Sequence, residues 1–277
     1  MYTSEISRSQ PTTYLFLVDQ SGSMSDMMSS GRAKSQFVAD VLNRTMRDLI
    51  VRCTREEGVR DYFSVGVIGY GGAGINNGLE GPLSTTWLNP ISEVAKSTLR
   101  VEDREKLVDD GVGGLAAQPV SFPVWFEQKA EGGTPMCDAI AKAAEVLADW
   151  CDENSNSFPP TVLHITDGES TDGDPENNAG ILRQIATNDG PVLMYNIHVS
   201  SQGGEPIRFP DSDSTLPNDY AKLLFRMSST FPDHVINYAR DAHGLTLSSE
   251  SHAMVFNAEA EEIVKFLDIG SRPAAMR

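Results

Sequence analysis

The sequence predicts an α/β fold in which helices flank a mostly parallel β-sheet. Apolar, β-branched runs of strand length alternate along the chain with longer segments whose apolar residues recur every three or four positions. Strands that are separated by helices indicate a parallel sheet with right-handed crossovers. Two of the strand-like runs end abruptly in an aspartate that a Gly/Ser turn follows. The expected architecture is therefore a doubly wound, Rossmann-like sheet whose functional edge lies at the carboxyl ends of its strands.

The first half of the chain predicts two strands and one long helix. The run at 14–19 is the first strand, and apolar residues from Phe37 to Cys53 then recur with helical spacing. Residues 62–70 form the next expected strand. Residues 72–131 form a long stretch after this strand, with many glycines near 71–81 and 111–114. Within it, 100–110 resembles a helix and 121–127 resembles a strand.

The second half continues the alternation of strands and helices. A helix is expected over 136–150, and the strand 161–166 leads through an acidic loop into a helix from about 174 to 188. A strand at 192–199 follows, and the polar, proline-containing residues 200–217 are expected to form a surface loop. The remaining expected elements are helices at 218–228 and 232–242, a short strand at 245–247 and a closing helix at 259–267.

Composition limits the classes of partner. The chain of 277 residues carries a formal charge of −17, with 39 acidic against 22 basic residues. Nucleic acid and anionic membranes are therefore poor partners. No apolar stretch approaches the length of a membrane span, and the N-terminal residues lack the apolar core of a signal peptide. We therefore expect a cytoplasmic protein with a flexible N-terminal tail at 1–12 and a single domain at 13–277.

Three segments carry oxygen-bearing side chains suited to one divalent cation. Asp19 and Asp167 each end a predicted buried strand, Ser21 and Ser23 follow the first of them, and Thr134 lies in a GGTP loop. The carboxyl ends of parallel strands meet at the edge of the sheet where ligands bind. Carboxylate and hydroxyl oxygens suit a hard cation such as Mg²⁺ better than zinc or copper. These five residues are the predicted metal ligands, with Mn²⁺ and Ca²⁺ as alternatives to Mg²⁺.

The same residues carry a resemblance to a known family. The D-x-S-x-S pattern of Asp19, Ser21 and Ser23, with the distant Thr134 and the T-D-G at 166–168, resembles the metal-ion-dependent adhesion site of von Willebrand factor A (VWA) domains. The resemblance covers most of the chain in order and spacing. It implies the VWA fold, which is a doubly wound sheet with one antiparallel edge strand. Relative to a minimal VWA domain, residues 72–131 are an extended insertion, which we expect to contain this edge strand and loops.

The family resemblance also implies roles for the five residues. Ser21 and Ser23 would bind the ion directly, Thr134 directly or through water, and Asp19 and Asp167 directly or by holding waters and hydroxyls in place. Neutral hydroxyl ligands leave much of the charge of the cation uncompensated. One open coordination position would then accept an Asp or Glu carboxylate from a partner protein, because Mg²⁺ exchanges a bound water for such an oxygen.

The expected function is that of a non-catalytic, Mg²⁺-dependent protein-binding module. DQSGSM at 19–24 and GGTPMCDAI at 132–140 are similar to bacterial cytoplasmic VWA proteins of the tellurium-resistance (TerY-like) type. That similarity implies an adaptor or scaffold in a bacterial stress-response or defence system, with a kinase, a phosphatase or a MoxR-type AAA ATPase as partner. Two alternatives stay open, which are a metal-dependent phosphoester hydrolase and a structural or chelatase-type assembly subunit.

Overall fold

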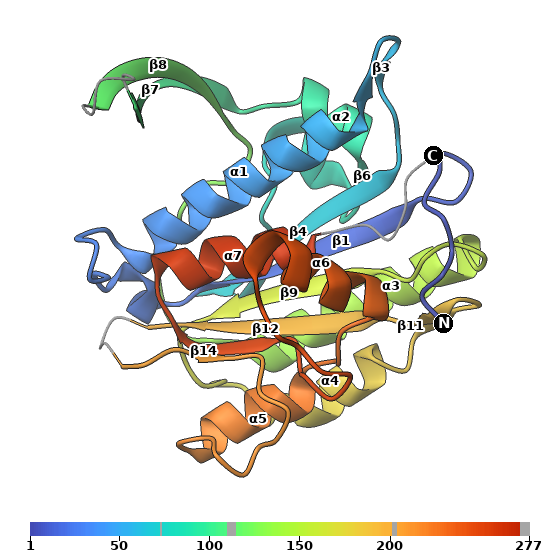
Figure 1. Cartoon of the computed structure of the whole chain (residues 1–277), viewed down its shortest axis with the longest axis vertical. Helices are drawn as coiled ribbons and strands as arrows, with labels where there is room; N and C mark the ends of the chain where they lie inside the picture. Colours follow the sequence, from blue (N-terminus) through green and yellow to red (C-terminus); the bar gives the residue numbers. More distant parts are fainter. Residues whose placement is uncertain (73, 110–114, 201–203, 272–277) are drawn as a thin grey trace.

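The computed structural model describes residues 1–72, 74–109, 115–200 and 204–271 and is built around one twisted β-sheet (Figure 1). Within these residues the strand order is β13-β14-β12-β9-β1-β4-β5, with β6 also paired to β4. The five central strands are parallel to one another. They are β1 (Thr12–Gln20), β4 (Phe63–Gly71), β9 (Thr161–Thr166), β12 (Leu193–Val199) and β14 (Met254–Ala258). The predicted α/β fold with a mostly parallel sheet is confirmed.

Short antiparallel strands lie at both edges of the sheet. Strands β5 (Gly74–Asn77) and β6 (Asn89–Pro90) run antiparallel to β4. They lie in the insertion where the sequence predicts an antiparallel edge strand. On the opposite side β13 (Ile207–Arg208) pairs antiparallel with β14, inside the segment expected to be a surface loop. The parallel core is therefore flanked by short strands that reverse direction.

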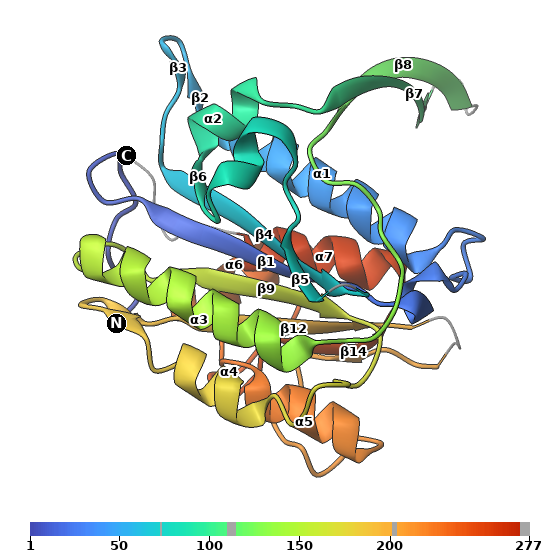
Figure 2. The ribbon, with the colours of Figure 1, turned by 180° about the vertical axis from the view of Figure 1, so that it is seen from behind.

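Helices cover both faces of the sheet (Figures 1 and 2). One face carries α1 (Lys34–Cys53), α2 (Ile91–Lys96), α6 (Asp233–His243) and α7 (Ala260–Gly270), and the other carries α3 (Met136–Glu153), α4 (Glu176–Leu182) and α5 (Asp219–Met227). Strand β1 shows why two apolar layers form, since alternate residues of a strand point to opposite faces. Tyr14, Phe16 and Val18 belong to one core, whereas Leu15 and Leu17 belong to the other.

A long antiparallel ribbon replaces the helix expected at 100–110. Strands β7 (Arg100–Asp109) and β8 (Leu115–Val124) pair along their whole length and project away from the sheet beyond α1 (Figure 1). The Arg, Glu and Lys residues of this segment favour helices, but ten cross-strand pairs override that preference. Arg104 fastens the ribbon to the body, because its guanidinium lies 2.9 Å from Asp40 on α1. The same guanidinium lies 3.6 Å over the ring of Phe122 within the ribbon.

The other differences from the sequence-based expectation are local. Residues 245–247 form no strand, and the strand β14 lies at 254–258 instead. The helix expected to continue to residue 188 ends at Leu182, because a hairpin of β10 (Ala186–Thr187) and β11 (Gly190–Pro191) follows. The smaller elements are a second hairpin, β2 (Thr54–Arg55) with β3 (Gly58–Val59), and the 3₁₀ helices η1 (Gly22–Ser25) and η2 (Gly81–Thr85).

The segment before β1, expected to be a flexible tail, makes specific contacts with the β10–β11 hairpin. Both Asp189 carboxylate oxygens accept backbone N–H bonds, one from Thr3 at 2.9 Å and the other from Ser4 at 3.0 Å. The backbone of Tyr2 also donates to the carbonyl oxygen of Asp189. These contacts place the N-terminal residues near the amino ends of the central strands.

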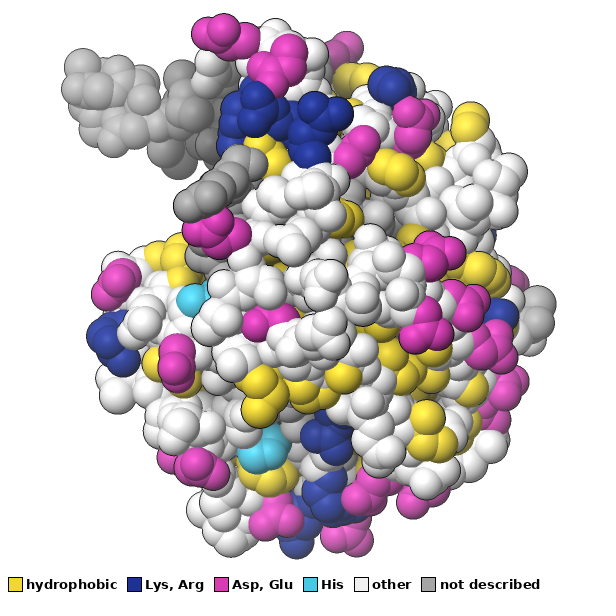
Figure 3. Space-filling view, turned by 90° about the vertical axis from the view of Figure 1, so that its right-hand side faces the viewer, with side chains coloured by type: hydrophobic (Ala, Val, Ile, Leu, Met, Phe, Trp, Pro, Cys, Tyr) yellow, Lys and Arg dark blue, Asp and Glu magenta, His cyan; other side chains and the backbone are white. Residues whose placement is uncertain are grey.

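The end of the molecule that carries the N-terminus has a mixed surface (Figure 3). Hydrophobic side chains appear there as small patches between polar ones, and acidic side chains are spread widely. Among the helices that the structure describes, none is long and apolar enough to cross a membrane.

Candidate metal centre

Two neighbouring parallel strands bring the predicted aspartates together. Asp19 is the penultimate residue of β1, and Asp167 directly follows β9. The two strands are paired in parallel, with Val18 opposite Ile165. Both carboxylates therefore lie at the same edge of the sheet, which is the carboxyl edge that the sequence predicts for the site.

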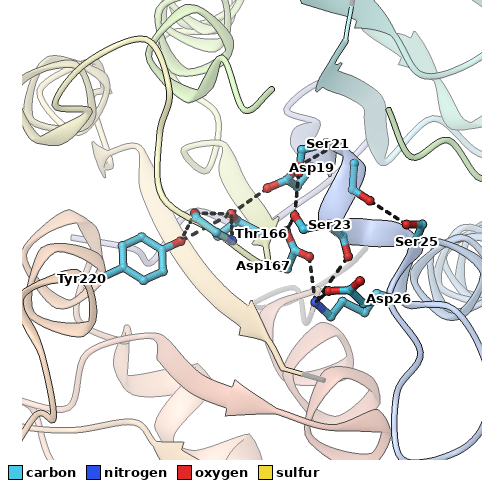
Figure 4. A network of polar contacts seen from close by, with 11 residues as sticks. Asp19, Ser21, Ser23, Ser25, Asp26, Thr166, Asp167 and Tyr220 are labelled. Atoms are coloured by element: carbon cyan, nitrogen blue, oxygen red, sulfur yellow. Dashed lines mark hydrogen bonds and ion pairs between the residues drawn. The ribbon is translucent and has the colours of Figure 1, made fainter. Parts of the chain in front are cut away.

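The hydroxyls of the first segment form a continuous oxygen cluster with Asp167 (Figure 4). The Oγ atoms of Ser21 and Ser23 are 3.1 Å apart, and Ser23 Oγ donates to Asp167 Oδ1 at 2.7 Å. The chain can place both serines here because it turns into the short helix η1 directly after β1. The structure thus assembles three of the five predicted ligands through direct hydrogen bonds between their side chains.

Asp19 lies beneath this cluster, buried and fixed on both oxygens. Its Oδ1 accepts the backbone N–H of Ser21 at 2.8 Å, and its Oδ2 accepts the hydroxyl of Thr166 at 2.9 Å. Burial, which leaves the residue 1% exposed, raises the pKa of Asp19 to about 6, and the nearby charge of Asp167 adds to the rise. A cation beside this carboxylate would compensate its charge and stabilise its ionised form.

The loop that contains Thr134 lies against both other segments. Gly22 donates its backbone N–H to the carbonyl oxygen of Gly132 at 3.0 Å. The backbone N–H of Thr134 donates to the hydroxyl of Thr171, and its carbonyl oxygen accepts the N–H of Thr171. Thr134 itself is 6% exposed. The third predicted segment is therefore beside the other two, joined to them through its backbone.

The spacing of these oxygens is compatible with a small divalent cation such as Mg²⁺. At a Mg²⁺–oxygen distance of about 2.05 Å, adjacent ligands of an octahedron are roughly 2.9 Å apart. The two measured separations, 3.1 Å between the serine hydroxyls and 2.7 Å from Ser23 to Asp167, bracket that value. Among the described residues there is no group of three or more His, Cys, Asp or Glu side chains able to hold a metal. The candidate site is of a different kind, since it combines two carboxylates with hydroxyls.

Lys34 belongs to the site although the sequence analysis did not identify it. Its Nζ lies 2.9 Å from Asp167 Oδ2, 3.4 Å from the carbonyl oxygen of Ser23 and 3.5 Å from Asp26 Oδ2. Lys34 is the first residue of α1, three positions before the apolar pattern begins. A lysine at a helix start gives no local signal of a buried ion pair, because Asp167, its buried partner, is 133 residues away.

Thr166 and Tyr220 also join the site. The Thr166 hydroxyl lies between Asp19 Oδ2 and the carbonyl oxygen of Gly168, and Tyr220 donates its hydroxyl to the same carbonyl oxygen (Figure 4). Tyr220 comes from the first turn of α5, whose N-cap residue Asn218 accepts the N–H of Ala221. The T-D-G segment signals Thr166, whereas the position of Tyr220 depends on tertiary packing.

A groove of about 440 Å³ opens beside the oxygen cluster. Its lining includes Ser23, Lys34 and Asp167 of the cluster and three aromatic residues, which are His198, Tyr220 and Phe256. His198 stacks on Phe256 with ring centroids 4.4 Å apart, and burial lowers the pKa of His198 to about 4, so its ring is neutral near pH 7. The candidate centre is thus reached from a groove large enough for a side chain of another protein.

A buried chain of hydrogen bonds crosses the sheet close to the site. The hydroxyl of Tyr70 on β4 is 2.6 Å from Nε2 of His164 on β9, and Nδ1 of His164 is 2.7 Å from Oδ1 of Asn196 on β12. The amide of Asn196 then donates to the Ser228 hydroxyl at 2.8 Å. Because an amide oxygen only accepts, His164 carries its proton on Nδ1 and accepts the Tyr70 hydroxyl at Nε2. This chain ties three strands to the end of α5.

Comparisons with known proteins give distant structural likenesses only. The chain matches no family model and no curated protein. Among solved structures it is similar to the manganese-loaded TRAP protein of Plasmodium vivax, with 14% identity, 97% of this chain and 74% of that chain covered, and a TM-score of 0.46. It is also similar to the PilB minor pilin of Streptococcus sanguinis, with 12% identity, 94% and 61% coverage, and a TM-score of 0.46. A third similar structure is the vWF domain of the type V pili tip protein Mfa5 from Porphyromonas gingivalis. Its identity is 12%, the match covers 58% of this chain and 39% of that chain, and the TM-score is 0.32.

Proposed function

We propose that this protein is a non-catalytic module that binds a divalent cation, Mg²⁺ in the first place, and uses it to capture an Asp or Glu carboxylate of a partner protein. The observation that carries the proposal is the hydrogen-bonded cluster of Ser21, Ser23 and Asp167 above the buried Asp19. Oxygen atoms at these separations are suited to a hard cation. The residues that would hold the ion are these four together with Thr134.

The chemistry of the ligands supports capture and not turnover. A cation that binds the two neutral serine hydroxyls directly, while Asp19 and Asp167 hold waters and hydroxyls around it, keeps much of its positive charge, which attracts an anionic group. The groove beside the cluster gives a partner side chain a route to the ion. Hydrolysis of a phosphoester would require a positioned base next to an attacking water. The nearest histidine in the groove, His198, accepts the backbone N–H of Asn257 at Nδ1 and stacks on Phe256.

The sequence patterns around residues 19–24 and 132–140 support a narrower proposal. They are similar to VWA proteins of the TerY-like type, which implies an adaptor or scaffold in the bacterial cytoplasm with a kinase, a phosphatase or a MoxR-type AAA ATPase as partner. The acidic surface, with a formal charge of −17, agrees with a protein partner and disfavours nucleic acid.

An affinity capture from host-cell lysate tests the proposal. The wild-type protein is used as bait in Mg²⁺ and in EDTA, and the variants Ser23→Ala and Ser25→Ala are used in Mg²⁺. Ser25 is the matched control, because it lies on the same turn and its hydroxyl donates to the carbonyl oxygen of Gly22 outside the cluster. We expect a partner that binds the wild-type and Ser25→Ala proteins in Mg²⁺ and is lost in the other two conditions.

Two further measurements separate the alternatives. Free Mn²⁺ is titrated with each bait by electron paramagnetic resonance, and each bait is assayed with a generic phosphoester. Identical partners in Mg²⁺ and EDTA would refute metal-dependent capture. Phosphoester turnover that Ser23→Ala abolishes would favour the hydrolase. Metal binding that raises the melting temperature without changing any partner would favour the structural or chelatase-type subunit.

A further inference from the structure

Lys34 brings a positive charge of the chain itself into the candidate metal centre. Its Nζ lies 2.9 Å from Asp167 Oδ2, and the two side chains are 5% and 0% exposed. Water therefore screens this pair far less than a surface ion pair. Lys34 and Asp167 form a buried contact that connects the start of α1 to the loop after β9.

Both carboxylate oxygens of Asp167 have partners in this arrangement. Oδ1 accepts the hydroxyl of Ser23, and Oδ2 accepts the ammonium of Lys34. The carbonyl oxygen of Ser23 is also 3.4 Å from the ammonium. A divalent cation held by the Ser21 and Ser23 hydroxyls would thus lie near a like charge, and two like charges a few ångström apart repel each other.

The position of Lys34 is not explained by the helix that carries it. A cation in the first turn of a helix is unfavourable, because the N-terminus of the helix is itself positive. The N-cap residue, Ala33, offers no side-chain acceptor. The compensating negative charges come from other segments, with Asp167 at 2.9 Å and the more exposed Asp26 at 3.5 Å.

We propose that Lys34 is a built-in counter-cation of the centre: it neutralises Asp167 when no metal is bound, and it lowers the affinity of the site for the divalent cation. This inference rests on the proposed function and adds its regulation. A carboxylate supplied by a partner adds negative charge beside both cations, so metal and partner bind more tightly together than separately.

The first test measures Mn²⁺ affinity by electron paramagnetic resonance in the wild-type, Lys34→Met and Lys142→Met proteins. Lys142 is the matched control, because it also carries one positive charge and pairs with Glu145 on α3. We expect Lys34→Met to bind Mn²⁺ on the order of tenfold more tightly than wild type. Lys142→Met should bind like wild type.

The second test measures melting temperatures in EDTA, where the metal has no part. Lys34→Met leaves Asp167 buried without its cation and should lower the melting temperature by roughly 5 °C or more. Lys34→Gln, which keeps a hydrogen-bond donor, is the second variant if Lys34→Met does not fold. Adding Asp167→Asn to either variant removes the uncompensated charge and should recover most of the loss.

The outcomes distinguish this inference from the proposed function. If Lys34→Met binds Mn²⁺ as tightly as wild type or more weakly, Lys34 does not lower the metal affinity of the site. If the losses in melting temperature of the two substitutions add up in the double variant, Lys34 does not neutralise Asp167. If no variant binds Mn²⁺, the proposed metal-dependent function fails. The melting temperatures of the single and double variants in EDTA then decide alone whether Lys34 is the counter-cation of Asp167.

Discussion

The buried hydrogen-bond chain through His164 predicts how the stability of the protein depends on pH. His164 is fully buried, accepts the hydroxyl of Tyr70 at Nε2 and donates to Asn196 from Nδ1. A second proton would have to displace the Tyr70 hydroxyl as donor. Burial lowers the pKa of His164 from 6.5 to about 4, and the bond to Asn196 offsets this only in part.

The size and sign of the effect follow from this pKa. In the unfolded chain the imidazole binds a proton near pH 6.5, whereas in the folded protein it does so only near pH 4. The stability that neutral His164 contributes is complete above pH 6.5 and is lost as the pH falls toward 4. The whole loss corresponds to about 3 kcal/mol, because one pKa unit is worth about 1.4 kcal/mol.

Urea unfolding in EDTA, followed between about pH 7.5 and 4.5, measures this loss in the wild-type and His164→Gln proteins. Glutamine does not titrate, so the wild-type protein should be the more stable at neutral pH and lose most of that advantage at the acidic end. Asp19, whose raised pKa has the opposite effect, and His198 are present in both proteins, so their contributions cancel. A stability difference that stays constant over the whole range would refute the assignment of a neutral, buried His164.

Three substitutions test other parts of the structure. Asn43→Leu removes three hydrogen bonds with the backbone at 125–126 and should cost about 3 kcal/mol in urea unfolding; a loss below about 1 kcal/mol would show that these bonds matter little. Gly132→Ala puts a Cβ 2.2 Å from a backbone Cα at a residue with φ of +68°, so it should abolish Mn²⁺ binding in a resonance titration; wild-type affinity would contradict the role of this loop. Thr166→Val removes a hydrogen bond to Asp19, whose pKa should then rise above about 6. The Mn²⁺ affinity of the Thr166→Val protein should fall more near pH 6 than near pH 8. Equal losses at both pH values would argue against a raised pKa of Asp19 in this variant.

The parts of the site that the sequence predicts are those with a local signal. Asp19 and Asp167 could be located because a buried strand and a Gly/Ser turn flank each of them, and the parallel pairing of β1 and β9 then brings them together. Lys34 and Tyr220 could not be located, because Asp167, the buried partner of Lys34, and Gly168, the acceptor of the Tyr220 hydroxyl, lie far from them in the chain. Their roles depend on how α1 and α5 pack and not on any nearby pattern.

The fold shows the same division between local and tertiary information. The strands β1, β4, β9 and β12 and the long helices carry a strong apolar pattern, and their positions agree with the structure within a few residues. The ribbon β7–β8 was expected in part to be a helix, because its charged residues favour helices while its stability comes from cross-strand pairing. Strand β14 was missed because only five residues, one of them Asn257 with φ of +57°, form it.

The attachment of residues 2–4 to Asp189 gives the molecule a practical orientation. This contact lies near the amino ends of the central strands, whereas the serine and aspartate oxygens lie at their carboxyl ends. A biotin or a resin linked to the first residue would therefore face away from the groove and leave it open to solution. Immobilisation through this end is the geometry in which a captured protein meets no obstruction from the support.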